Sequence, residues 1–83
     1  MTATSLSSRS KAKAFLQRCE RRAVPGRDPN RQIGWWLDGT LVAEGMSYKD
    51  KYGNLISSIV GVEGTEGRSI GLYGQDALDL WHY

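Results

Sequence analysis

The residues of this chain that could carry catalysis are scarce, and each has a structural explanation. The 83 residues include one histidine and one cysteine. Nucleophilic catalysis needs a base held within hydrogen-bond reach of the nucleophile, and His82 stands beside the last residue, where a side chain is poorly fixed. Cys19 falls on an apolar stripe, where a thiol behaves as a small hydrophobic side chain. We therefore expect no catalytic residue, and this pair is too small for a structural zinc site.

Two pairs of carboxylates and one glycine-rich segment are the other candidates for chemistry. Asp76 and Asp79 suit the first turn of a short helix, where free amides and the helix dipole favour anions. Glu63 and Glu66 lie in the segment GVEGTEG, residues 61–67. That segment has no lysine followed by serine or threonine, so it does not match a phosphate-binding loop. We interpret it as a turn, and the sequence predicts a protein that is not an enzyme and holds no cofactor or metal ion.

The charged residues are divided unevenly along the chain. Residues 1–31 hold eight cations and two carboxylates, whereas residues 32–83 hold three cations and seven carboxylates. On one helix the N-terminal cations would form a surface that can contact phosphates, although any surface helix also needs a polar face of this kind. The candidate nucleic-acid-binding residues are Lys11, Lys13, Arg18, Arg21, Arg22, Arg27 and Arg31.

Two adjacent tryptophans are the second candidate feature. Neighbouring side chains of a strand point to opposite faces of the sheet, so Trp35 and Trp36 cannot enter the same core. Trp36 either stands partly exposed, as binding hot spots often do, or is buried against Trp81 by the C-terminal segment. The sequence leaves both alternatives open. The candidate partner-binding residues are Trp36, Leu41 and Tyr48 from the expected sheet and Arg18 and Arg22 from the expected helix.

The first element expected to position these residues is an amphipathic helix. Residues 1–8 are small and polar without periodicity, so we expect a flexible tail there and a single domain over residues 9–83. The helix should begin near Ser8 to Ser10, because the apolar positions 12, 15, 16, 19 and 23 then share one helical face. Pro25 and Gly26 should end it.

From Gln32 onward the apolar residues alternate as in strands. Asp38-Gly39 predicts a two-residue hairpin turn with positive φ at both positions. In that register residues 37, 36 and 35 face residues 40, 41 and 42, respectively. The segments LISSIVGV (55–62) and RSIGLYG (68–74) predict two further strands.

The last nine residues, QDALDLWHY, predict a short helix that directs Ala77, Leu80 and Trp81 inward, with a fifth strand as the alternative. The expected fold is therefore α+β, with an N-terminal amphipathic helix on a three- to four-stranded antiparallel sheet and a short C-terminal helix. The predicted core consists of Phe15, Leu16, Cys19, Ile33, Trp35, Leu37, Val42, Leu55, Ile59 and Leu72.

These observations favour a small protein-binding module without enzymatic activity. The uneven charge can orient association with a complementary protein partner. Small independent binders are frequent among phage-encoded proteins that block host machinery, so an anti-CRISPR-like inhibitor is one form that we expect. The alternative is a nucleic-acid-binding protein that uses the basic helix. No apolar run approaches the roughly 20 residues of a membrane-spanning helix, so we expect a cytoplasmic protein with no membrane contact, and its oligomeric state is left open.

Overall fold

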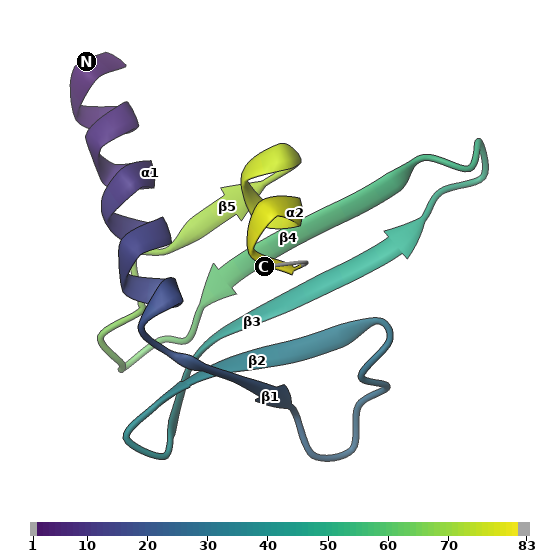
Figure 1. Cartoon of the computed structure of the whole chain (residues 1–83), viewed down its shortest axis with the longest axis horizontal. Helices are drawn as coiled ribbons and strands as arrows, with labels where there is room; N and C mark the ends of the chain where they lie inside the picture. Colours follow the sequence, from purple (N-terminus) through teal and green to yellow (C-terminus); the bar gives the residue numbers. More distant parts are fainter. Residues whose placement is uncertain (1, 82–83) are drawn as a thin grey trace.

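The computed structural model describes residues 2–81 of the chain and the side chains of residues 9–81. The elements are α1 (Thr2–Gln17), β1 (Glu20–Ala23), β2 (Gln32–Leu37), β3 (Thr40–Lys49), β4 (Leu55–Gly61), β5 (Gly71–Tyr73) and α2 (Gln75–Trp81). The five strands form one antiparallel sheet in the order β1-β2-β3-β4-β5 (Figure 1). The predicted α+β class is confirmed, and the sheet has five strands where we expected three to four.

The additional strand, β1, uses residues that the sequence assigned to the end of the helix. α1 ends at Gln17, and residues 20–23 pair with residues 33–36 of β2. Helix propensity is a weak preference that tertiary pairing overrides, and here the pairing extends the sheet beyond β2. At its other end α1 begins at Thr2, within the segment expected to be a flexible tail. No glycine or proline occurs before Pro25 to interrupt a helix there.

The β2–β3 hairpin has the predicted turn but not the whole predicted register. The turn residues, Asp38–Gly39, have φ of 50° and 81°, and the first two predicted residue pairs form. The third prediction is wrong. Trp35 pairs with Ala43, because Val42 is the extra residue of a β-bulge. The bulge reverses the alternation of β3, so Met46 faces away from Trp35.

The loop of residues 62–70 packs against this bulge. The Val62 amide donates a hydrogen bond to the Val42 carbonyl at 2.9 Å. A Cβ atom on Gly67 would lie 2.2 Å from that same carbonyl oxygen, so only glycine allows the loop to come this close. The glycine-rich segment therefore has a structural role consistent with its interpretation as a turn.

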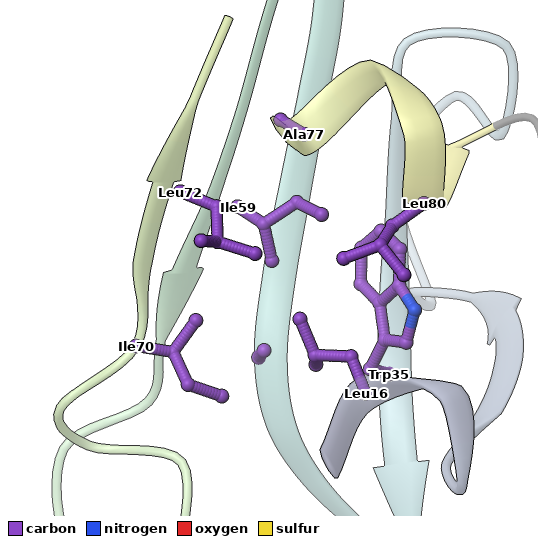
Figure 2. Packing of buried hydrophobic residues seen from close by; sticks show 8 residues of the cluster. Leu16, Trp35, Ile59, Ile70, Leu72, Ala77 and Leu80 are labelled. Atoms are coloured by element: carbon purple, nitrogen blue, oxygen red, sulfur yellow. The ribbon is translucent and has the colours of Figure 1, made fainter. Parts of the chain in front are cut away.

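The core lies between the sheet and the two helices. Leu16 of α1 and Leu80 of α2 point toward Trp35, which is 1% exposed (Figure 2). Trp35 also meets Trp81 edge to face, with ring centroids 6.3 Å apart. A Cβ atom on Gly45 would lie within 2.6 Å of Trp35 and 2.8 Å of Trp81, so this glycine allows both rings to lie against β3.

Most of the predicted core is confirmed. Leu55 is the exception, since it is 42% exposed. It begins β4 beside the turn of residues 50–54, beyond the residues that pair with β5. The C-terminal helix contributes Ala77 and Leu80, as predicted. The buried members of the predicted set are Leu16, Trp35, Val42, Ile59 and Leu72, and the partly buried members are Phe15, Cys19, Ile33 and Leu37.

Candidate functional site

The two faces of the sheet differ in what covers them. Side chains from both helices join the core cluster, so both helices lie over the same face (Figure 1). The opposite face carries large apolar side chains that are 39% to 65% exposed. We call five of these residues the open-face patch. They are Met46 and Tyr48 of β3, Ile56 and Val60 of β4, and Tyr73 of β5.

The strand register makes the open-face patch continuous. Tyr48 pairs with Ile56, and Ser58 lies between its two pairing partners, Met46 and Tyr73. Residues paired across antiparallel strands point to the same face, with Cβ atoms about 4.5–5.5 Å apart. Val60 extends the patch along β4. The resulting surface is aromatic and aliphatic, with no charged member.

Trp36 lies on the same face but forms a separate cluster beside the patch. Its ring packs over Gly34, where a Cβ atom would lie 2.9 Å from Nε1. Nε1 donates a hydrogen bond to the Arg22 carbonyl at 3.3 Å, and the Arg22 guanidinium lies 4.4 Å from the ring centroid. Trp36 is partly buried by these contacts. It does not pack on Trp81, which lies with Trp35 on the covered face, so of the two sequence alternatives the partly exposed ring describes Trp36.

Four of the five predicted partner-binding residues share this face. The register of β1, β2 and β3 places Arg22, Trp36, Leu41 and Tyr48 there. Arg18 is separate, because it follows α1 and its guanidinium lies 5.7 Å from the centroid of the Phe15 ring. Of the five predicted partner-binding residues, only Tyr48 belongs to the open-face patch.

The predicted basic helix is wrong as a single surface. α1 ends at Gln17, and Arg21 and Arg22 are neighbours on β1 that point to opposite faces of the sheet. Arg21 Nη1 donates hydrogen bonds to the carbonyls of Leu80, at 3.0 Å, and of Trp81. A cation at this position satisfies the last carbonyls of α2 and complements the helix dipole. Arg21 is therefore committed to holding α2 against the sheet.

The basic residues of α1 also have structural contacts. Lys13 Nζ lies 2.7 Å from Asp76 Oδ1, and Arg9 Nε lies 3.7 Å from Asp76 Oδ2. These contacts join α1 to α2. The hydrogen bond from Lys13 holds the pKa of the Asp76 carboxyl below its ordinary value. Of the remaining predicted cations, Lys11 lies on α1, and Arg27 and Arg31 lie on the loop between β1 and β2.

The Asp76 contact predicts a pH-dependent loss of stability. Asp76→Asn should lower the melting temperature at neutral pH, because the lowered carboxyl pKa adds stability above the unfolded value of about 4. That stability disappears as the pH falls through the folded pKa, so wild type and variant should melt alike near pH 2. The side chain is partly exposed, and we expect a difference of about 1 kcal/mol or less. Thermal melts followed by circular dichroism measure it.

Asp79→Asn is the matched control for this experiment. Asp79 Oδ1 accepts an exposed hydrogen bond from Gln75 Nε2 at 2.8 Å within α2, and it does not contact α1 through an ion pair among the described residues. We expect a smaller change in melting temperature than for Asp76→Asn. An equal pH dependence in both variants would show that Lys13 is not the source of the effect.

The catalytic candidates gain no support from their surroundings. Cys19 is partly buried, its thiol lies 3.4 Å from the Phe15 carbonyl, and burial raises the pKa of the thiol above its ordinary value. A thiol with a raised pKa is a poor nucleophile. His82 lies outside the described residues. Within residues 2–81, no group of three or more histidine, cysteine, aspartate or glutamate side chains is placed to bind a metal ion.

Comparison with protein-family models, curated proteins and solved structures finds no significant match to this chain. Neither helix of the described part has the length and apolar content that crossing a bilayer requires.

Sequence reasoning missed most members of the open-face patch, although one signal for them was present. The segment LISSIV carries apolar residues in both phases of the strand alternation, with Leu55 and Ile59 in one phase and Ile56 and Val60 in the other. A strand that is apolar on both sides is typical of a sheet that is packed on both faces. Because the two helices lie on one face only, the second phase stays exposed.

Proposed function

We propose that this chain is a protein-binding module without enzymatic activity, which docks a partner protein on the open-face patch. The observation that carries the proposal is the continuous set of large apolar side chains, each at least 39% exposed, on the uncovered face of the sheet. Contiguous apolar surface of this kind marks interaction sites in small proteins. Tyrosine and methionine, which make up three of the five patch residues, are enriched in protein interfaces.

The charge around the patch favours a protein partner over a nucleic acid. Single-stranded nucleic acid binds where aromatic side chains are interleaved with cations that follow the phosphates. No cation belongs to the patch, and Val60 lies opposite a carboxylate, that of Glu44. Arg22, on the same face, is stacked on Trp36 and lies 4.0 Å from the Glu20 carboxylate. These features support apolar docking of a protein.

A small binding module can act by covering a surface of its partner. A bound chain of 9.2 kDa can block a surface that a larger assembly needs, which is how an inhibitor of the anti-CRISPR kind works. We propose such an inhibitor as the specific form of the binding function, and identification of the captured partner tests it.

Affinity capture from cells of the source organism tests the proposal, with and without nuclease. The baits are the wild-type chain, the patch variant Val60→Thr/Tyr73→Thr and the control Tyr52→Thr, which removes an exposed tyrosine from the turn between β3 and β4. We expect one protein to be retained in near-equal amounts by wild type and control, regardless of nuclease, and to be lost with the patch variant. Capture that the patch variant preserves would contradict the proposal, and capture that nuclease abolishes would indicate nucleic-acid binding.

A further inference from the structure

A groove of about 760 Å³ adjoins the open-face patch. Its two walls are the end of the β1–β2 loop and the β3–β4 hairpin, which extend from the same end of the sheet (Figure 1). The Ser47 amide donates a hydrogen bond to the Arg31 carbonyl at 2.8 Å, which joins these walls at their base. The loop contributes Asn30 and Arg31 to the lining, and the hairpin contributes Met46, Ser47, Tyr48, Lys49 and Leu55.

Both charged side chains in the groove lining are cations. They belong to Arg31 and Lys49, and no carboxylate lines the groove. Among the residues whose side chains the structure describes, neither cation has a carboxylate within ion-pair distance. The turns of the two walls also hold carboxylates, those of Asp28 and Asp50, which accept hydrogen bonds at 2.9 Å from backbone amides of their own turns. The lining of the groove therefore carries only positive charge.

We infer that this groove binds an acidic segment of the partner protein, in which an aspartate or glutamate lies next to an apolar residue. The carboxylate would meet Arg31 and Lys49, and the apolar side chain would pack on Leu55, which pairs with Lys49. Arginine binds carboxylates through two parallel hydrogen bonds, which gives such a contact direction as well as charge. The inference rests on the proposed function, and it adds the chemistry of the partner.

The position of the groove connects it to the proposed docking surface. Met46 and Tyr48 line the groove and also belong to the open-face patch. Lys49 and its pairing partner Leu55 belong to the opposite phase of the two strands, so the groove lies at the edge of β3, where residues 47–49 no longer pair with β2. A partner seated on the patch therefore reaches the two cations around this edge. The cations then sit at the rim of an apolar interface, where charge complementarity speeds association and sets the register of docking.

A peptide carboxylate fits this arrangement better than a nucleic-acid backbone. Phosphates follow one another along a strand, and binding them requires cations along the same path. Arg31 and Lys49 are the two cations of one groove at one end of the sheet, and the patch beside the groove has no charged member. We therefore expect the groove to bind an acidic peptide, and oligothymidylate is the probe for nucleic-acid binding.

Selection from a random linear peptide library on the immobilised full chain tests the inference. The affinity of the selected peptides is then measured by fluorescence anisotropy for wild type, for Arg31→Gln/Lys49→Gln and for Lys11→Gln/Arg68→Gln. The last variant removes the same charge from exposed positions outside the groove. We expect selected peptides rich in aspartate or glutamate beside apolar residues, with affinity at least about tenfold weaker for the groove variant and changed by less than about twofold for the control.

Three results would overturn the inference. The first is that the selected peptides show no acidic bias. The second is that both double variants weaken peptide affinity equally. The third is that oligothymidylate binds more tightly than any selected peptide and that its binding also depends on Arg31 and Lys49. The test also separates this inference from the proposed function, because Val60 and Tyr73 do not line the groove. If partner capture requires Val60 and Tyr73 but the selected peptides show no acidic bias, the inference about the groove is wrong and the proposed docking on the patch is retained. If acidic peptides bind the groove but partner capture does not depend on Val60 and Tyr73, the inference about the groove is retained and the proposed docking on the patch is wrong.

Discussion

Replacing Trp35 with alanine is expected to unfold most of the protein, whereas the same change at its neighbour Trp36 is expected to leave the protein folded. Trp35 is 1% exposed and packs between Leu16, Leu80 and Trp81. Removing a buried tryptophan costs about 3–5 kcal/mol, and a small domain has a total stability near the lower end of about 5–15 kcal/mol. The loss is therefore close to the whole free energy of unfolding.

Trp36→Ala is the matched control, because the residue type and the strand are the same. Trp36 is partly exposed, and its removal loses the contact with the Arg22 guanidinium and one hydrogen bond. We expect a cost of about 1–2 kcal/mol. Urea denaturation followed by circular dichroism compares the two variants. Equal destabilisation would show that the two faces of the sheet do not differ as described.

The Val60→Thr/Tyr73→Thr variant is expected to bind the captured partner at least about 30-fold more weakly than wild type, while its stability changes by no more than about 1 kcal/mol. A tyrosine at the centre of an interface commonly contributes about 2 kcal/mol or more to affinity. Threonine keeps the β-branched shape that suits a strand, and both side chains are exposed, so the fold should lose little. Biolayer interferometry with the purified partner measures the affinity.

Tyr52→Thr is the matched control, because it makes the same change as Tyr73→Thr at an exposed tyrosine outside the patch. Tyr52 is 76% exposed, and like Tyr73 it is a tyrosine at the surface. We expect its replacement to change the affinity by less than about twofold. A larger loss with Tyr52→Thr than with the patch variant would move the docking surface from the sheet to the tip of the hairpin.

The parts of the fold that the sequence predicted are those with local signals. Asp38-Gly39 specifies its turn through two positive φ values, and the alternation after Gln32 specifies strands. β1 could not be predicted in this way, because Cys19 and Ala23 continue the helical spacing of α1. Pairing with β2, which is a tertiary contact, decides the conformation of residues 20–23.

The membership of the candidate site depends on a second non-local effect. The bulge at Val42 is packed against the loop of residues 62–70, twenty residues or more along the chain. Strict alternation from the predicted hairpin register would place Met46 on the covered face. With the bulge, Met46 lies on the open face beside Ser58 and near Tyr73. The same alternation would place Tyr48 on the covered face, so the sequence could not indicate the patch that surrounds it.

The environment of Trp36 was also beyond the sequence. Its partial burial comes from Arg22 on β1, which was expected in a helix, and from the absence of a side chain at Gly34. The two adjacent tryptophans correctly indicated two apolar faces. They did not indicate that the more exposed apolar residues lie on β3, β4 and β5.

Site-specific photocrosslinking in cells of the source organism tests the central proposal most directly. Benzoylphenylalanine would replace Tyr73 or Ile56 on the open-face patch and, in control chains, Lys11 on α1 or Arg68 in the loop before β5. The account predicts that both patch positions give a covalent adduct with the same protein and that the control positions do not. Adducts with a protein from Lys11 or Arg68 but not from the patch, or patch adducts that nuclease removes, would contradict it.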